Sequence, residues 1–355
     1  MKKKLIRTST VLLTVAASLG VAACGSSSNS STSSGSASSS SSSSNLTGAG
    51  STLVAPLLSQ WQPKYDQEHG VAVTYGAIGS GGGIEQITAR TVDFGASDAP
   101  LTSSQASACK GCVQIPWALS ATAVAYHVQG VPTGLKLTGP ILSDIWLGKI
   151  KTWNDPAIKK LNPGVNLPST KITPVYRTDG SGDTYAFTNY LSHVSSEWKS
   201  KVGTSTQVHF PVGLGGKGNS GVGGVLTSTN GAIAYVALAY VVSNKFTDAA
   251  VQNAAGKFEA PGISSISAAA ATVKSIPSDN AISIVDPPAS ASGAYPISTF
   301  TYVIVPTKSS KASGLKKFIT WALGSEAQAL GPKLDFAPLP AKVVTAGKNT
   351  LNKLG

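Results

Sequence analysis

The sequence predicts an α/β protein with two lobes, and three observations support this. Short apolar runs rich in β-branched residues alternate with longer stretches in which apolar residues recur at helical spacing. Several of these runs end in turns of Gly, Ser, Thr and Asp, the residues that commonly begin helices. About 310 residues follow the N-terminal region, which is more than one hydrophobic core usually serves.

The first 24 residues predict an export signal. Four cations fall within the first seven residues, and the mostly apolar run from 11 to 19 is too short to span a bilayer. Small residues then lead to Cys24, a pattern that resembles a bacterial lipobox and implies that Cys24 becomes a lipidated N-terminus. An ordinary signal with a chance cysteine is the alternative.

Residues 25–46 predict a disordered tether. Fifteen of the 21 residues from 25 to 45 are serine, so this segment cannot bury a core. Its reach is on the order of 25 Å by random-coil scaling. A lipid, a flexible tether and a folded body indicate a protein that works at the outer face of the cytoplasmic membrane without crossing it.

The charge balance is basic, with 28 Lys and Arg against 16 Asp and Glu and a net charge of +12. Without the four cations of the signal, the net charge is +8. Such a balance can indicate a nucleic-acid partner. No run of Lys and Arg with interleaved aromatic residues follows the signal, so we expect no nucleic acid and favour a cationic surface that attracts a small anion.

Cys109 and Cys112 form a close pair in Cys-Lys-Gly-Cys. Outside the cytosol such a pair is most simply a disulfide that clips a short loop. A redox centre would need an exposed thiol of lowered pKa in a strand-to-helix setting, and a zinc site would need two further ligands, which are not nearby. We therefore expect a structural disulfide, no metal and no cofactor.

Polar residues gather at four turns where a predicted strand meets a predicted helix, namely residues 47–52, 76–83, 97–101 and 177–183. At the first turn, Ser51 or Thr52 is expected to cap the helix that contains Trp61 and Tyr65. At the second, three glycines after Ser80 would let the backbone approach a ligand closely. If the turns converge at the carboxyl edge of the sheet, they form one site.

Other stretches complete the α/β pattern. The expected strands are residues 71–75, 92–96, 172–176, 231–236 and 300–305, with a pair of strands within 113–128. The expected helices are residues 141–148, 184–191 and 314–330, with further helices after Thr102 and Pro156.

The fourth turn, Arg-Thr-Asp-Gly-Ser-Gly-Asp at 177–183, is the stretch around which the site is organised. A Gly-rich turn that opens a helix presents free backbone N–H groups at the positive end of the helix dipole, where anions bind. Arg177 would add a planar guanidinium matched to paired oxygens. Asp179 is unexpected there, because a pure anion trap has no use for a carboxylate.

Seven motifs occur in order along the chain: Thr-Gly-Ala-Gly-Ser-Thr (47–52), Gly-Ser-Gly-Gly-Gly-Ile (79–84), Val-Asp-Phe-Gly-Ala-Ser-Asp-Ala-Pro-Leu (92–101), Leu-Gly-Lys-Ile-Lys-Thr-Trp (147–153), Arg-Thr-Asp-Gly-Ser-Gly (177–182), Gly-Leu-Gly-Gly-Lys-Gly-Asn (213–219) and Tyr-Pro-Ile (295–297). With them the chain resembles the phosphate-binding proteins of bacterial phosphate ABC transporters, over nearly everything from Leu46 onward.

The resemblance implies a two-lobe periplasmic-binding-protein fold of type II, with two chain crossings at the hinge. Lobe I would take residues 47–128 and 291–355, and lobe II residues 129–290. It also implies that a monomer binds inorganic phosphate between the lobes, outside the cytoplasm, and delivers it to the membrane permease of the transporter.

The resemblance further implies phosphate-binding roles for nine residues. The donors to the anion would be the hydroxyls of Thr52 and Ser80, the backbone N–H of Leu53, the guanidinium of Arg177, and Ser181 and Gly182 at the helix start. Asp98 would accept a proton from phosphate, and Asp179 would pair with Arg177. Asp183 departs from the family, which often has Thr there. Either its side chain caps the helix and faces away from the anion, which we favour, or it accepts a second phosphate proton and favours the monoanion.

The chemistry of phosphate independently supports a carboxylate in the site. Phosphate near pH 7 keeps at least one proton, whereas sulfate keeps none. Donors alone would hold either ion, but a buried acceptor such as Asp98 gains a bond from P–OH and repels sulfate. Sites that pair with a substrate hydroxyl reject analogues without it by roughly 10⁴ or more. Asp179 would then orient Arg177 and balance its charge. The alternative is that Asp98 is only a turn residue.

A phosphate-ester hydrolase with a serine nucleophile and a binder of another tetrahedral oxyanion are the alternative functions. Ser181 lies in Gly-Ser-Gly without the Gly-x-Ser-x-Gly pattern, and no histidine has a local context that marks a catalytic base. Residues 213–218 lack the P-loop spacing, so Lys217 is expected on the surface or between the lobes. We therefore expect a binding protein with no catalytic residue, rather than an enzyme.

Overall fold

The computed structural model describes residues 45–355. The predicted signal, the lipidation site Cys24 and the predicted tether up to residue 44 lie outside the described residues. Leu46, the last residue of the predicted tether, is buried and begins β1 (Leu46–Gly50). In the described part of the chain, no helix is both long enough and apolar enough to cross a bilayer.

The described residues contain eleven strands and thirteen α-helices. The strands after β1 are β2 (Val73–Ala77), β3 (Phe94–Ser97), β4 (Cys112–His127), β5 (Leu135–Leu137), β6 (Thr173–Arg177), β7 (Leu214–Gly216), β8 (Ala232–Ala237), β9 (Thr247–Gln252), β10 (Phe258–Glu259) and β11 (Ser298–Pro306). The helices are α1 (Ala55–His69), α2 (Ser80–Thr88), α3 (Ser103–Ala108), α4 (Gly139–Trp146), α5 (Pro156–Leu161), α6 (Gly182–Val194), α7 (Ser196–Lys201), α8 (Gly218–Ser228), α9 (Leu238–Asn244), α10 (Ile263–Ala271), α11 (Ala312–Ala322), α12 (Ser325–Gln328) and α13 (Ala341–Leu351), with a 3-10 turn at Pro332–Leu334.

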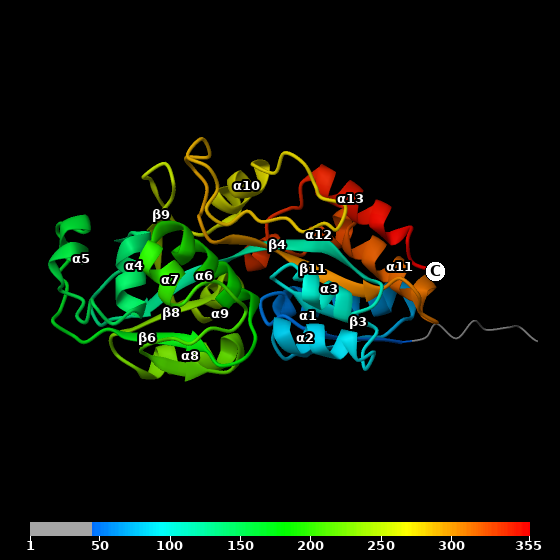
Figure 1. Ribbon diagram of the computed structural model, residues 1–355, viewed down its shortest axis with the longest axis horizontal. Coiled ribbons are helices and arrows are strands. Elements are labelled where there is room, and N and C mark those ends of the chain that lie inside the picture. Colours follow the sequence, from blue (N-terminus) through cyan, green and yellow to red (C-terminus); the bar gives the residue numbers. More distant parts are fainter. Residues whose placement is uncertain (1–44) are drawn as a thin grey trace, which may run out of the picture. The chain divides into compact units, whose positions relative to one another are not determined.

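One sheet runs through these elements in the order β2-β1-β3-β11-β4-β8-β6-β7 (Figure 1). The strand β4 joins its two halves, because residues 112–121 pair antiparallel with β11 and residues 122–127 pair antiparallel with β8. The pair of strands predicted within 113–128 is therefore wrong. No turn interrupts this stretch, and the strand continues past Pro116 at a register shift. Both of its faces are covered, so its residues are almost all buried.

In the half that contains β1, β2, β3 and β11, helices cover both faces of the sheet. On the face of α1, α11 and α13, Trp61 packs edge-on against Trp117 with 5.4 Å between ring centroids. On the face of α2 and α3, Ile84 and Ile87 pack with Ile304 of β11. Between these layers, β1, β2 and β3 run parallel, so their carboxyl ends lie at one edge.

In the other half, α4 and α6 lie on one side of β6 and β8, and α8 lies on the other (Figure 1). Phe187 of α6 packs at 4.7 Å from both Trp146 of α4 and Tyr235 of β8. Val222 and Leu226 of α8 are buried against the opposite side. The start of α6 is thus held at the end of β6, where the fourth predicted turn lies.

The remaining predictions of secondary structure are confirmed, apart from one helix and with ends that differ by a few residues. The exception is the helix predicted over 314–330, which is divided into α11 and α12. Gly324 adopts an extended backbone between them, with φ −79° and ψ 160°, because glycine is a poor helix former. The predicted disulfide between Cys109 and Cys112 is confirmed and closes the loop between α3 and β4.

Candidate functional site

The four predicted turns converge at one place. β1, β2 and β3 run parallel to one another, so the first three turns lie along one edge of the sheet, the first edge. β6 runs parallel to β7 and β8, so the fourth turn lies along a second edge. The two edges are in direct contact. The N–H of Gly182 donates to Ser80 Oγ at 3.1 Å, and the N–H of Gly81 donates to the carbonyl of Gly180 at 2.9 Å.

Asp98, directly after β3, is the central acceptor of the first edge and is 1% exposed. Its Oδ1 accepts from Ser51 Oγ at 2.6 Å and Thr301 Oγ1 at 2.7 Å, and its Oδ2 accepts from Ser51 Oγ at 2.7 Å and Ser80 Oγ at 3.3 Å. Burial raises the pKa of Asp98 to about 7, and the charge of Asp183 adds to this, while the hydroxyl bonds oppose it. Asp98 is therefore a buried carboxyl that can hold or release a proton near neutral pH.

The predicted helix cap at Ser51 or Thr52 is wrong. The N-cap residue of α1 is Val54, and the helix has no side-chain cap. Ser51 Oγ accepts from the N–H groups of Leu53 at 3.0 Å and Val54 at 3.2 Å, while it donates to Asp98. A buried carboxylate is a strong acceptor, so it holds the Ser51 side chain in the turn and the helix begins later.

Leu53 and Ser181, two of the predicted donors, both have protein acceptors for their backbone N–H groups. Leu53 is buried, and its N–H donates to Ser51 Oγ. The N–H of Ser181 donates to the carbonyl of Thr206 at 2.8 Å. Ser181 Oγ accepts from the N–H of Thr184 at 3.4 Å and caps α6.

Arg177 and Asp179 form a two-bond pair on the second edge. Nε of Arg177 donates to Oδ1 of Asp179 at 2.8 Å and Nη2 donates to Oδ2 at 2.5 Å. The Arg177 side chain is 1% exposed. The N–H of Gly218 also donates to Asp179 Oδ1, at 2.9 Å. Burial works to raise the pKa of Asp179, but the bonds and charge of Arg177 outweigh it, so the pKa is lowered. Asp179 therefore favours its ionised form and orients the guanidinium of Arg177.

The favoured interpretation of Asp183 as a helix cap facing away is wrong. Asp183 is 1% exposed, and its Oδ2 accepts from Nη1 of Arg177 at 3.1 Å and from Asn219 Nδ2 at 2.9 Å. Its Oδ1 accepts from Thr122 Oγ1 at 2.8 Å. Burial raises the pKa of Asp183, and the charge of Arg177 opposes this. The arginine of the same motif attracts the carboxylate inward, and Ser181 caps the helix in its place.

Asn219 is a residue of this site that the sequence analysis did not assign. It is fully buried at the start of α8. Its Nδ2 donates to Thr52 Oγ1 at 2.8 Å as well as to Asp183, and its Oδ1 accepts from the N–H of Ala237 at 2.9 Å. The signal that could have found it is the motif at 213–219, which ends in this asparagine. Thr122 and Thr301 offered no local signal, because both lie within long buried strands.

Two glycines allow the edges to meet. A Cβ on Gly182 would lie 2.4 Å from the Cβ of Asp98, and one on Gly79 would lie 2.3 Å from Oδ2 of Asp179. Gly79 also has φ 94°, a backbone conformation that favours glycine. The site thus brings together the carboxylates of Asp98, Asp179 and Asp183, the guanidinium and the helix N-terminus.

Comparisons with known proteins agree with this geometry. The family model described as the PBP superfamily domain matches residues 34–326. The phosphate-binding protein PstS of Xylella fastidiosa (strain Temecula1) is 43% identical over 303 residues, which cover 84% of this chain and 82% of that protein. PstS of Pasteurella multocida is 39% identical over 303 residues, covering 84% and 87%.

Solved structures give the same fold. A high-affinity periplasmic phosphate-binding protein, solved with phosphate bound, superposes with a TM-score of 0.68 at 20% identity, covering 88% of this chain and 99% of that one. An ABC-type phosphate transport receptor from Vibrio cholerae superposes with a TM-score of 0.55 at 20% identity, covering 83% and 100%.

The fold is therefore that of the type II periplasmic binding proteins, as predicted, and the class is the PBP superfamily. Within that superfamily, the chain belongs to the PstS family of phosphate-binding proteins.

Proposed function

We propose that the chain binds inorganic phosphate between lobe I (47–128 and 291–355) and lobe II (129–290) and delivers it to the permease subunits of a phosphate ABC transporter. The names of its PstS relatives support phosphate as the ligand. The proposal rests mainly on one observation, the contact between the buried carboxyl of Asp98 and the donor end of α6 at Gly182.

The donors to phosphate are the hydroxyls and N–H groups predicted from the motifs: Thr52, Leu53, Ser80, Ser181 and Gly182, with the guanidinium of Arg177. Several of these groups bond to one another in the structure. The Ser80 hydroxyl and the Gly182 N–H, now paired with each other, would each turn to a phosphate oxygen. The ion would thus connect the two lobes where a direct bond connects them now, and its binding would favour closure.

Asp98 supplies selectivity in this proposal. It accepts a hydrogen bond from P–OH, whereas a sulfate oxygen in the same place would meet a carboxylate with no proton between them. Asp179 holds the Arg177 guanidinium toward the anion. Asp183, which faces inward, is the acceptor for a second phosphate proton. If Asp183→Thr left the pH dependence of phosphate affinity unchanged, that role would be excluded.

Isothermal titration with phosphate, arsenate and sulfate tests the function. Arsenate has the same shape and protonation as phosphate, so we expect both to bind and sulfate to give no signal. Sulfate binding as tight as phosphate binding would indicate a general oxyanion binder, and absence of phosphate binding would overturn the proposal. Incubation with a phosphomonoester tests the hydrolase alternative, because turnover would identify an enzyme.

We also propose export and lipid anchoring outside the cytoplasmic membrane. Residues 1–24 would be the signal peptide, Cys24 would receive the lipid, including palmitate, and the residues between Cys24 and β1 would tether a monomeric body. We expect labelled palmitate to be incorporated by the natural chain and not by Cys24→Ser, and the variant to leave the membrane fraction. A Cys24→Ser variant that stays membrane-bound would contradict the anchor without affecting the phosphate proposal.

A further inference from the structure

Arg90 contacts both sulfurs of the disulfide. Its Nη1 lies 3.3 Å from Cys109 Sγ and 3.1 Å from Cys112 Sγ, and the same nitrogen donates to the carbonyl of Ile87 at 2.7 Å. Its Nη2 donates to the carbonyls of Cys109 at 2.7 Å and Lys110 at 3.2 Å. Because a guanidinium stays protonated at any ordinary pH, a permanent positive charge faces the disulfide.

Arg90 has a left-handed backbone conformation, which indicates that the contacts of its side chain favour arginine at this position. Arg90 follows the end of α2 and has φ 58°, in the left-handed region where helices commonly end in glycine. An arginine is strained at such a position, and its hydrogen bonds offset the strain. If Arg90 bonded only the backbone carbonyl groups, its role would be purely structural. The two sulfur contacts are additional, and they place the charge where a thiolate would form.

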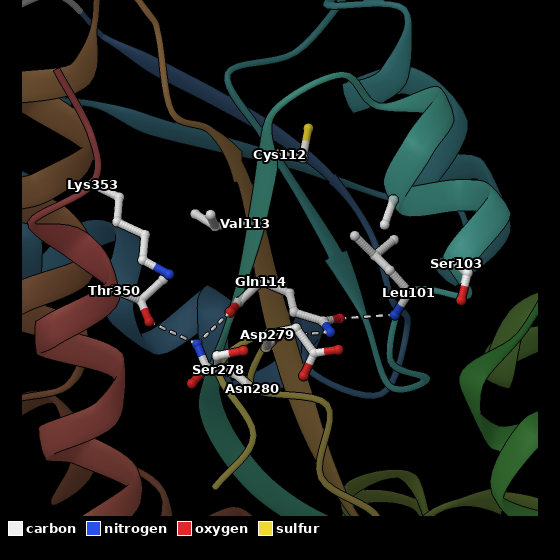
Figure 2. Close-up of a pocket in the computed structure, with 11 residues that line it drawn as sticks. Leu101, Ser103, Cys112, Val113, Gln114, Ser278, Asp279, Asn280, Thr350 and Lys353 are labelled. Carbon is white, nitrogen blue, oxygen red and sulfur yellow. Dashed lines mark hydrogen bonds between the residues drawn. The ribbon is translucent and has the colours of Figure 1, made fainter.

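The two cysteines differ in accessibility. Cys109 is 1% exposed, whereas Cys112 is partly exposed. Cys112 lines a cavity of about 500 Å³ between α3, the first residues of β4 and the C-terminal segment (Figure 2). Lys353 lines the same cavity. A small thiol in this cavity could therefore reach Cys112, while Cys109 is shielded.

We propose that Cys109–Cys112 is an exchange-competent disulfide that reacts with external low-molecular-weight thiols or dithiols at Cys112, in addition to clipping the loop. An external thiolate attacks Cys112 Sγ and forms a new S–S bond. The bond between Cys112 and Cys109 breaks, and its electron pair stays on Cys109 Sγ as a thiolate. Arg90 stabilises this leaving group, which speeds the step. The arginine thus supplies the charge that a helix N-terminus supplies in other reactive cysteine pairs.

A second step completes the reaction. Another external thiolate attacks the external sulfur of the mixed disulfide, which releases an oxidised external disulfide and a Cys112 thiolate. Two external thiols therefore supply the two electrons that reduce the pair. The Cys112 thiolate also lies beside Nη1 of Arg90, so the reduced form is stabilised as well.

The test uses the full chain with Cys24→Ser, so that the pair provides its only two cysteines. The folded protein is treated with reduced glutathione, and free thiols are alkylated and counted by mass spectrometry. We expect reduction without denaturant and a mixed disulfide located on Cys112. Arg90→Gln keeps donor groups but removes the charge, and it should slow the reaction roughly tenfold.

Two controls separate the charge from the structural role of Arg90. Arg90→Lys keeps the charge and should react at nearly the parent rate. In concentrated guanidinium chloride, the parent and Arg90→Gln should react at the same rate, because the effect depends on folded geometry. No reduction of the folded protein, equal rates for the folded parent and Arg90→Gln, or a mixed disulfide on Cys109 would each overturn the proposal. The location of the mixed disulfide in the parent tests it even if Arg90→Gln does not fold.

Discussion

Asp98 and Asp179, which lie on the two edges that meet at the proposed phosphate site, are held in different ways. Within the described residues, the Asp98 carboxylate accepts hydrogen bonds only from the hydroxyls of Ser51, Ser80 and Thr301. Asp179, on the opposite edge, is bonded by two nitrogens of Arg177. Burial acts on both carboxylates, yet the pKa of Asp98 is raised to about 7 and the pKa of Asp179 is lowered.

This difference shows what hydroxyl partners can and cannot do. A hydroxyl satisfies a carboxylate oxygen but does not neutralise its charge, so the cost of burying the charge remains and the proton is held more tightly. At Asp179 the bonds and charge of the Arg177 guanidinium outweigh that cost. Asp98 can therefore respond to a proton carried by the ligand, whereas Asp179 stays ionised and fixes the orientation of the Arg177 guanidinium.

Asp98→Asn should have the largest effect, which is on the preference for phosphate over sulfate. An amide can turn its NH₂ toward sulfate. We therefore expect most of the parent's preference for phosphate over sulfate, roughly 10⁴-fold or more, to be lost. Isothermal titration with both anions measures this. Asp248→Asn is the control, because Asp248 bonds Thr133 and contacts none of the proposed ligand groups. A variant at Asp98 that still rejects sulfate would contradict the assigned role.

Arg177→Gln should have the next largest effect, on stability. Without the guanidinium, Asp179 and Asp183 stay buried or half-buried without a counter-charge. Removing one partner of a buried pair costs about 3–5 kcal/mol of unfolding free energy. Asp98→Asn should cost much less, since it removes a buried charge that has no cation partner. Urea denaturation without phosphate compares the two. Similar losses would contradict the proposed difference between Asp98 and the Arg177–Asp179 pair.

The parts of this site that could be predicted from sequence are those whose chemistry is local. Ser80, Asp98, Arg177 and Gly182 each lie in a turn between a strand and a helix, where nearby glycines and caps mark the backbone geometry. Thr301 could not be found in this way. It lies 203 residues from Asp98 in sequence, within a buried strand, and only the pairing of β11 with β3 and β4 brings it to the carboxylate.

The errors have a common physical cause, which is that a distant or stronger partner overrides a local preference. Ser51 has a good capping side chain, but it bonds the carboxylate of Asp98. Asp183 lies in the first turn of a helix, where an acid is favourable, yet Arg177 and Asn219 attract it inward. The fold class was more predictable, because alternating strands and helices leave a periodic pattern over the whole chain.

The contributions of Asp98 and Asp179 to the pH dependence of stability should differ in sign. The raised pKa of Asp98 means that its protonated form contributes stability, which is complete below its ordinary value of about 4 and lost as the pH rises through about 7. The lowered pKa of Asp179 means that its ionised form contributes stability above about 4, which is lost as the pH falls through its lower folded value. Between about pH 4 and about pH 7, the melting temperature of Asp98→Asn should vary less with pH than that of the parent. Below about pH 4, the melting temperature of Asp179→Asn should vary less with pH than that of the parent. Parallel curves for Asp98→Asn and the parent would contradict this assignment.

Asn219→Asp removes a donor that joins the two edges and so tests how much this link contributes to phosphate binding. The variant keeps an acceptor for the N–H of Ala237 but loses the Nδ2 bonds to Thr52 and Asp183 and adds a negative charge. We expect phosphate affinity to fall by roughly tenfold or more. Asn253→Asp is the matched control, since its Nδ2 bonds the carbonyls of Ser292 and Ala294. Equal loss of affinity in both variants would point to general destabilisation.

Thr301→Val should have the smallest effect and the most specific one. It removes one hydroxyl bond to the Asp98 carboxylate, which costs about 1 kcal/mol and raises the pKa of Asp98, since that bond lowers it. Thr299→Val is a matched control, because the Thr299 hydroxyl donates at 3.0 Å to the backbone carbonyl of Asp98. It should lose similar stability without moving the pKa. Carboxyl titration followed by NMR distinguishes the variants, and an equal pKa shift in both would show that the hydroxyl at 301 does not tune the carboxylate. A shift in Thr301→Val alone would show that neutral donors set how tightly Asp98 holds its proton.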